Sequence, residues 1–259
     1  MHIVLTGATG VVGSSVLNHI INHGAGVTRL TILSRNPKIP LLETQTPPTQ
    51  LKVDVVTHKD FLTYPSALLS SLSTADALIW ALGISQSQVS TEEYISITRD
   101  FAVAAAKAFG ANPSKPEGQL LKFVFVSGEG ATTTPGRFTP LFGRVKGETE
   151  KTLLALNASA ECPDLRVYSA RPGGVDSGAD PAVAAATTEK RAIGSRKFEP
   201  ILMPIFRAVY WNMVSPTKEL SKVLVEIASR NGDKYEDGPG ISGEGRTLSN
   251  VALRKLAGI

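Results

Sequence analysis

Residues 2–13 read HIVLTGATGVVG, an apolar run that passes into three glycines and then into a helical pattern. The run predicts a buried strand, and the pattern after it predicts a helix that starts at Val11. Glycines at this junction suit a bound diphosphate, because Gly7 permits a tight turn, Gly10 lets the backbone approach a ligand and Gly13 lets the helix pack closely. The helix N-terminus adds free N–H groups and partial positive charge, so the stretch predicts a dinucleotide site.

The second predicted strand, residues 28–33, ends in Ser34 and Arg35, and no Asp or Glu occurs before Glu43. A site for an unphosphorylated adenosine ribose usually places an acid at this point, whereas a 2′-phosphate favours an arginine. The sequence therefore predicts NADP(H). The alternatives are a solvated surface arginine at position 35 and ordinary turns at the three glycines.

Strands and helices alternate over the first 170 residues, which indicates an α/β fold of the doubly wound, Rossmann type with a parallel sheet. The predicted strands are 2–6, 28–33, 51–56, 77–81, 121–126 and 165–170, and the predicted helices are 11–23, 91–109 and 141–156. Thr91 is the expected cap of the helix over 91–109. Residues 37–50 hold four prolines and are expected to form a loop.

The alternation stops after the sixth strand, so we divide the chain into a nucleotide-binding core, residues 1–172, and a C-terminal segment, residues 173–259, packed on the same domain. Helices are predicted over 200–213, 215–230 and 249–256. Ser215 is the expected cap of the second helix, with Pro216 at its first position. We expect this small, mostly helical segment to cover the substrate, because insertions there lie over the carboxyl edge of the sheet. The apolar stripe in 203–213 suits either a substrate pocket or the core.

The composition is that of an enzyme-sized domain rather than a nucleic-acid-binding or membrane protein. Of 259 residues, 42% are hydrophobic and 19% are charged, which is enough to bury a sizeable core. The net charge is +4 and the basic residues are scattered without aromatic interleaving, so nucleic-acid binding is not expected. No apolar run approaches about eighteen residues, so no membrane span is expected.

Cys162 is the only cysteine, which excludes an internal disulfide and a cysteine metal cluster. His19 and His23 lie one helical turn apart, but no third ligand accompanies them, so we expect no metal site. The single thiol points to a reducing compartment, and the core strand at the start leaves no room for a leader. We therefore expect a cytoplasmic protein, whose oligomeric state stays open, with a homodimer allowed.

Short motifs follow several predicted strands, and another lies in the helix over 141–156. They are Thr6–Gly13, Asp60-Phe61, Ala81-Leu82-Gly83, Val126-Ser127-Gly128, Val145–Glu148 and Arg171-Pro172-Gly173. Together they resemble the atypical, extended-type short-chain dehydrogenase/reductases over most of the chain. The segments Ala81–Ser85, Arg99–Phe101 and Phe142–Glu148 are most similar to the Tat-interacting-protein-like branch and its fungal relatives.

This resemblance implies a Rossmann fold that binds NADP(H), with the adenine beside Asp60 and Phe61 and the nicotinamide near Pro172 and Gly173. The cofactor-binding residues predicted by the glycine stretch and by the resemblance together are Gly7, Thr9, Gly10, Val11, Val12, Gly13, Ser34, Arg35, Asp60, Phe61, Ala81, Leu82, Gly83, Lys146, Pro172, Gly173 and Val175. The expected partner is a small hydrophobic substrate.

One position departs from the family pattern, in which a helix carries Tyr-x-x-x-Lys with both side chains on one face. In that pattern the lysine lowers the pKa of the tyrosine and holds the cofactor ribose, while the tyrosine exchanges a proton with the substrate oxygen. This chain has Phe142 and Lys146 at the two positions, and phenylalanine has no proton to give. The loss removes help worth typically about 10²- to 10⁴-fold in rate.

A reductase with this sequence requires a substitute for the missing hydroxyl. Ser127 matches the active-site serine of the family and can polarise a carbonyl, and Lys146 can donate a proton directly or through water. Tyr94, Thr139 and Tyr168 are further hydroxyls that the sequence alone does not place. Two redox reactions need no such tyrosine: one on a substrate with its own acid, and one that adds hydride to a conjugated alkene.

Each catalytic candidate also has a purely structural interpretation. Phe142 suits the core side of an amphipathic helix, and Tyr94 suits aromatic packing near a helix start. Lys146 could pair with Glu150 one turn later, an interaction worth about 0.2 to 0.5 kcal/mol.

Three functions remain compatible with the sequence. The first is an NADPH-dependent oxidoreductase that acts on a hydrophobic carbonyl or enone, with Ser127, Lys146, Phe142 and Tyr94 as its catalytic positions. The second is a non-redox enzyme on the same fold, an isomerase, cyclase or dehydratase, with secondary metabolism as one setting. The third is a regulatory protein that senses NADP(H). Phe142 favours the second and third functions, because it lacks the hydroxyl that a conventional reductase uses. A fold alone does not settle function.

Overall fold

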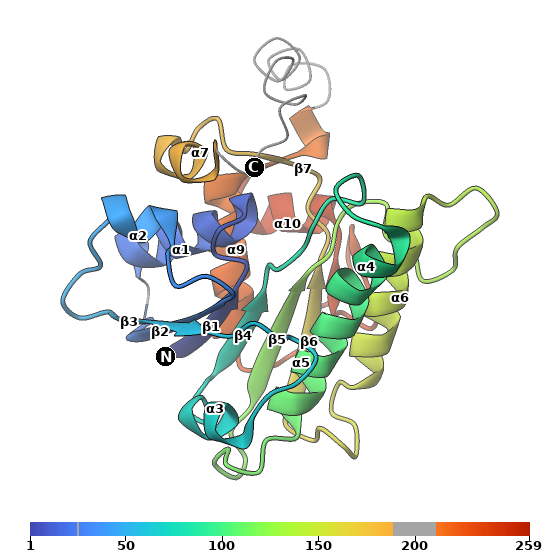
Figure 1. Ribbon diagram of the computed structural model, residues 1–259. Helices are drawn as coiled ribbons and strands as arrows, with labels where there is room; N and C mark the ends of the chain where they lie inside the picture. The colour runs from blue at the N-terminus through green and yellow to red at the C-terminus, as the bar shows by residue number, and fades with distance from the viewer. Residues whose placement is uncertain (25, 189–210) are drawn as a thin grey trace.

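The computed structural model describes residues 1–24, 26–188 and 211–259 of the chain. Within these residues the core is an eight-stranded sheet in the order β3-β2-β1-β4-β5-β6-β10-β9, with helices on both faces (Figure 1). Its strands are β1 (His2–Thr6), β2 (Arg29–Ser34), β3 (Lys52–Thr57), β4 (Ala77–Trp80), β5 (Leu121–Val126), β6 (Leu165–Ala170), β9 (Ile241–Ser242) and β10 (Thr247–Leu248). Neighbouring strands are parallel except β9 and β10, which are antiparallel. The order 3-2-1-4-5-6 is that of a doubly wound Rossmann sheet, so the predicted fold class is confirmed.

Helices form a layer on each side of this sheet. On one side α1 (Val11–His23) and α10 (Asn250–Ala257) both pack against α9 (Thr217–Ser229), and on the other side α5 (Phe101–Gly110) packs against α6 (Leu141–Ala155) (Figure 1). The shorter helical elements are α2 (Pro40–Thr44), α3 (Ser66–Ser71), α4 (Thr91–Ile95), the π-helix η1 (Ser96–Asp100), α7 (Pro181–Thr187) and the 3₁₀ turn η3 (Trp211–Met213). Two further strands, β7 (Gly174–Asp176) and β8 (Val214–Pro216), pair in parallel as a second small sheet.

Alternate residues of β1 face the two layers of the core. Ile3 and Leu5 belong to the same buried cluster as Leu224 of α9, whereas Val4 belongs to a cluster with Phe109 of α5. All of these side chains are almost fully buried. Because both faces of a central parallel strand are covered, its sequence reads as a continuous apolar run rather than an alternating one.

The strand order reverses between β1 and β4, whose residues Thr6 and Trp80 are partners in register. In open parallel sheets, ligands bind beyond the carboxyl ends of the strands where the order reverses. This topology brings the Gly7 turn after β1 next to the segment that begins with Ala81 after β4.

The helix predicted over 91–109 differs from the observed one in its cap and in its regularity. Ser90, not Thr91, caps it, since the Ser90 hydroxyl accepts a hydrogen bond from the backbone N–H of Glu93 at 3.2 Å. Its middle is the π-helical turn η1, which lies between α4 and α5. The loop predicted over 37–50 contains the short helix α2, which has Pro40 in its first turn, where proline is tolerated.

The C-terminal segment differs more from its prediction. Ser215 lies in β8 rather than at a helix cap, and α9 begins at Thr217 with Pro216 as its cap residue. Most of the helix predicted over 200–213 lies outside the described residues. Besides any covering role, residues after 173 complete the core, because α9 packs on α1 and β10 extends the sheet beside β6.

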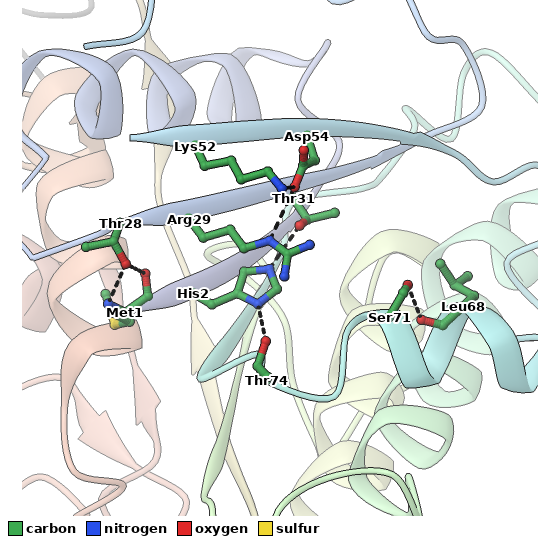
Figure 2. Close-up of polar contacts among 10 residues, drawn as sticks. All are labelled: Met1, His2, Thr28, Arg29, Thr31, Lys52, Asp54, Leu68, Ser71 and Thr74. Atoms are coloured by element: carbon green, nitrogen blue, oxygen red, sulfur yellow. Dashed lines mark hydrogen bonds and ion pairs between the residues drawn. The ribbon is translucent and has the colours of Figure 1, made fainter. Parts of the chain in front are cut away.

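Polar side chains gather at the amino edge of the sheet (Figure 2). The ring of His2 is hydrogen-bonded on both sides, with Nε2 2.9 Å from the Thr31 hydroxyl and Nδ1 3.2 Å from the Thr74 hydroxyl. Burial, with help from the charge of Arg29, lowers the pKa of His2 to about 4. Beside it, Arg29 pairs with Asp54 at 3.2 Å. In the described part of the chain, no helix is long and apolar enough to cross a membrane.

Candidate nucleotide and active site

The turn between β1 and α1 depends on glycine at two positions. Gly7 adopts a positive φ of 73°, and a side chain on it would collide with the backbone carbonyl of Ala81. A side chain on Gly13 would collide with the carbonyl of Gly7, so Gly13 brings α1 close to the turn. Gly10 is the N-cap residue of α1, and its N–H donates to the Gly7 carbonyl at 2.9 Å. The turn therefore presents the start of α1 to the crevice.

A cleft of about 1360 Å³ lies over this crevice. It exceeds the roughly 300–1,000 Å³ of ordinary small-molecule sites, so it has room for a long ligand. Of the predicted cofactor-binding residues, those that line it are Gly7, Thr9, Gly10, Val11, Val12, Ser34, Arg35, Phe61, Ala81, Leu82, Gly83, Lys146, Pro172, Gly173 and Val175. Gly13 and Asp60 lie outside its lining, and of the predicted catalytic residues only Ser127 and Lys146 line it.

The loop after β2 forms one end of the cleft. Asn36 organises this loop, since its N–H donates to the Ser34 hydroxyl at 3.2 Å and its side-chain oxygen accepts from the Lys38 N–H at 2.9 Å. Arg35 is exposed and lines the cleft. Among the described residues in the lining, Glu129 is the only acid, and it belongs to the loop after β5. The Arg35 end is therefore positively charged, as a phosphate requires.

Asp60 and Phe61 have different places: Phe61 lines the cleft, and Asp60 forms hydrogen bonds within the turn that follows it. Phe61 is fully buried, lines the cleft, and meets Trp80 edge to face with ring centroids 5.8 Å apart. Asp60 instead accepts hydrogen bonds from the Thr63 hydroxyl at 2.8 Å and the Leu62 N–H at 2.9 Å. The Thr63 bond is the main cause that lowers the pKa of Asp60.

Ser127 and Lys146 meet at the carboxyl end of β5. The Lys146 amine donates to the backbone carbonyl of Ser127 at 2.6 Å and lies 3.5 Å from that of Val126. Burial lowers the pKa of Lys146 to about 8, against the opposing charge of Glu150. Ser127 is almost fully buried, and its hydroxyl has no hydrogen-bond partner among the described residues. A buried hydroxyl of this kind calls for a bound group, because most buried polar atoms are paired.

Glu150 does not form the ion pair with Lys146 that the sequence allowed. Its buried carboxylate pairs with Arg171 and accepts a hydrogen bond from the Ser169 hydroxyl at 2.9 Å. Lys146 therefore contacts the backbone carbonyls of Val126 and Ser127 at the end of β5 instead.

Phe142 lies one turn before Lys146 on α6, outside the cleft lining. Its ring packs on Gly130, where an added Cβ would lie 3.2 Å from a ring carbon. Gly130 itself lines the cleft, so the aromatic ring supports the wall at this point. Phe142 therefore supplies no proton donor to this wall of the cleft.

The other predicted hydroxyls are not in the lining. Tyr94 is buried on α4, its pKa is raised by burial, and its hydroxyl bonds to the side chain of Thr98, which does line the cleft. The Thr139 hydroxyl accepts from the Gly136 N–H at 2.9 Å in the loop before α6. Tyr168 donates to the carbonyl of Asp233 at 2.8 Å and is fully buried in the core layer of α9.

Glu129 and Thr98 are two of the cleft residues that the sequence analysis missed. Glu129 follows Ser127 by two positions, and its place just beyond a central strand was an available signal. Thr98 follows Tyr94 by one helical turn, and its place in the π-helical turn η1 had no sequence signal. Irregular turns of this type often occur at functional sites.

No protein-family model matches the chain. Among curated proteins, the botcinic acid biosynthesis cluster B protein 16 of Botryotinia fuckeliana (strain B05.10) is 38% identical over 139 residues. The match covers 53% of this chain and 86% of that protein.

Several solved structures share the fold. MoeE5 in complex with UDP-glucuronic acid and NAD has a TM-score of 0.63 at 14% identity, covering 100% of this chain and 93% of that chain. A short-chain type dehydrogenase/reductase from Mycobacterium ulcerans has a TM-score of 0.61 at 14% identity, covering 97% and 89%. The ligand-free aldohexose dehydrogenase of Thermoplasma acidophilum has a TM-score of 0.60 at 15% identity, covering 98% and 94%. The chain thus has the short-chain dehydrogenase/reductase fold, and by sequence it belongs to the family of botcinic acid biosynthesis cluster B protein 16.

Proposed function

We propose that this protein is an NADP(H)-dependent oxidoreductase that acts on a hydrophobic carbonyl or enone of secondary metabolism. One observation carries the proposal: a single cleft is lined by the glycine turn, by Arg35 and by the Ser127–Lys146 pair. The name of the 38% identical relative, which refers to botcinic acid biosynthesis, supports a secondary-metabolite substrate. The resemblance to the Tat-interacting-protein-like branch remains an expectation.

The residues of the cleft fit a dinucleotide. Gly7 and Gly10 leave the start of α1 open to a diphosphate, and the unpartnered Ser127 hydroxyl is available to a bound group. Arg35 would hold the 2′-phosphate, and Lys146 would hold the nicotinamide ribose. When bound, NADP(H) supplies or accepts the hydride.

The chain's own residues must handle the substrate oxygen. The Ser127 hydroxyl can donate a hydrogen bond to a carbonyl, which polarises it. Lys146 has three N–H groups and directs two contacts at backbone carbonyls, so one N–H remains for a ligand. With a pKa of about 8, its ammonium form is an acid suited to neutral pH. An enone lowers the demand further, because hydride adds to its β-carbon and leaves a delocalised enolate, which water can protonate at the α-carbon.

Cofactor titration followed by turnover tests the proposal. We expect NADPH to bind more tightly than NADH, as read from fluorescence and melting temperature. We also expect some members of a ketone and enone panel to be reduced, with loss of NADPH fluorescence as the readout. Absence of binding would remove the nucleotide proposal, and binding without turnover would favour the non-redox or sensing functions.

Phe142 supports a second candidate, a non-redox enzyme that uses the same cleft. A reductase gains from a tyrosine at this position, whereas a reaction that moves a proton between carbon atoms needs a base elsewhere.

A further inference from the structure

Glu129 has a defined position in the lining of the cleft. It follows the Ser127–Gly128 pair at the end of β5, and its backbone N–H donates to the Pro172 carbonyl after β6 at 2.8 Å. Its side chain reaches α10, where the carboxylate accepts a hydrogen bond from the Asn250 N–H at 2.9 Å. Both contacts hold Glu129 between two strand ends and a helix start.

This position is close to the reacting groups of the proposed site. A Cβ on neighbouring Gly128 would lie 3.6 Å from the Lys146 amine, so the loop runs directly past that amine. The amide of Asn250 lies 3.1 Å from where a Cβ on Gly173 would be, and Gly173 belongs to the expected nicotinamide end. Glu129 is exposed and lines the cleft, so this residue is accessible to a molecule bound there.

Glu129 is also the one carboxylate in the described lining, opposite the basic end at Arg35. Phe142, which packs on the adjacent Gly130, contributes no proton. The titratable groups that face the cleft near the strand ends are therefore a carboxylate at position 129 and an amine at position 146.

We propose that Glu129 is a general base that removes a proton from the carbon next to the carbonyl of a hydrophobic ketone. The inference rests on the proposed function, because it assigns a second reaction to the same cleft and the same class of substrate. It gives the cleft a proton-transfer activity that does not depend on hydride transfer.

The step balances without any further reactant. The α C–H bond breaks and its proton passes to the Glu129 carboxylate, while the electron pair forms a carbon–carbon double bond. The carbonyl π pair moves to oxygen, and the resulting enolate is stabilised by the Ser127 hydroxyl and the Lys146 ammonium. Return of the proton to the same or a conjugated carbon regenerates Glu129 and completes an exchange or an isomerisation. A carboxylate can perform this step when donors stabilise the enolate oxygen.

A structural role for Glu129 must be separated from a chemical one. Its carboxylate serves the first N–H of α10, at a helix start where the cap residue Ser249 provides no side-chain hydrogen bond. The substitution Glu129→Gln keeps an oxygen acceptor of the same length for this N–H but removes the base. The substitution Glu129→Asp keeps a carboxylate on a shorter side chain.

The test is deuterium exchange in D₂O. Purified full-length protein is incubated with NADP⁺ and with cyclohexanone, octan-2-one or cyclohex-2-enone, and deuterium at the carbon next to the carbonyl is measured by NMR. We expect exchange above the buffer rate for the wild type, a loss of about 10²-fold or more in Glu129→Gln, and partial activity in Glu129→Asp. The control Glu161→Gln, at an exposed site outside the cleft, should exchange like the wild type, and all variants should share its melting temperature.

The other outcomes separate this inference from the proposed function. Full exchange in Glu129→Gln assigns the base to another residue. NADPH oxidation by the wild type without exchange on any probe rejects Glu129 as a carbon base while the oxidoreductase proposal stands. Exchange without NADPH oxidation supports Glu129 and counts against the oxidoreductase. Failure of NADP(H) to bind, together with no exchange, rejects both.

Discussion

The side-chain amine of Lys146 lies 2.6 Å from the backbone carbonyl oxygen of Ser127 and donates a hydrogen bond to it. This contact ties α6 to the end of β5, where both residues line the cleft. Replacing Lys146 by Met keeps the length of the side chain and removes its charge and donors. We expect cofactor affinity to fall about 10-fold or more and turnover to be lost, with Lys151→Met on the exposed part of α6 as the control.

The pH dependence of turnover follows from the same amine. Burial lowers the pKa of Lys146 to about 8, so its ammonium form is present below that pH and disappears above it. If this ammonium donates the proton or stabilises the developing oxyanion, reduction should slow as pH rises through about 8. A profile that stays level to about pH 10 in the wild type would exclude Lys146 as the acid.

Arg35 sets the expected choice between the two nicotinamide cofactors. Replacing it by Asp turns attraction for a 2′-phosphate into repulsion and offers a partner to an unphosphorylated ribose. We expect the affinity for NADPH to fall by roughly 10- to 100-fold and the affinity for NADH to hold or rise. Lys151→Asp makes the same charge change on α6 and should alter neither affinity by more than about 2-fold. An equal loss for both cofactors would contradict the 2′-phosphate role.

Substitutions at Gly10 and Gly13 should distinguish an effect on dinucleotide binding from an effect on folding. A Cβ on Gly10 would lie 3.4 Å from the Gly7 carbonyl and face the cleft, so Gly10→Ala should fold and lose dinucleotide affinity. A Cβ on Gly13 would collide with the same carbonyl, so Gly13→Ala should lower the free energy of unfolding by about 1–3 kcal/mol. Urea unfolding and NADPH titration of both variants distinguish the two effects. A stable Gly13→Ala would contradict the close approach of α1.

His2 makes the fold sensitive to acid. Its pKa is about 4 in the folded protein and 6.5 in an unfolded chain, so between these values only the unfolded chain binds the proton. The free energy of unfolding therefore falls as pH decreases from 6.5 toward 4. His2→Gln should reduce the difference in the free energy of unfolding between pH 7 and pH 5 by about 2 kcal/mol, measured by urea unfolding, whereas the exposed His23→Gln should not. An unchanged slope in His2→Gln would place the acid sensitivity elsewhere, with His19 next in line because its pKa is also about 4.

Strong local signals made the sheet and the glycine turn predictable from the sequence. The run His2–Thr6 and the glycines after it combine strand, turn and helix start within a few residues, and local rules suffice there. The prediction that Ser215 caps a helix was wrong, because its hydroxyl makes other hydrogen bonds. It donates to the side-chain oxygen of Asn250 at 2.6 Å and accepts from the Gly173 N–H. Glu129 and Asn250 meet across 121 residues of chain, and local patterns cannot report such a contact.

Phe142→Tyr tests whether a tyrosine at this position gives the protein ketone reduction. The ring packs on Gly130 and is only partly buried, so the added hydroxyl should fit without loss of stability, which a melting curve can check. If the native protein reduces a carbonyl with help from Lys146, a tyrosine one turn away should raise the rate by up to about 10²- to 10⁴-fold on a simple ketone. If the native reaction is a proton transfer at Glu129, the same variant should gain ketone reduction while deuterium exchange stays at the wild-type rate. A variant that binds NADPH and gains neither would show that the ring at position 142 is directed away from the reacting atoms.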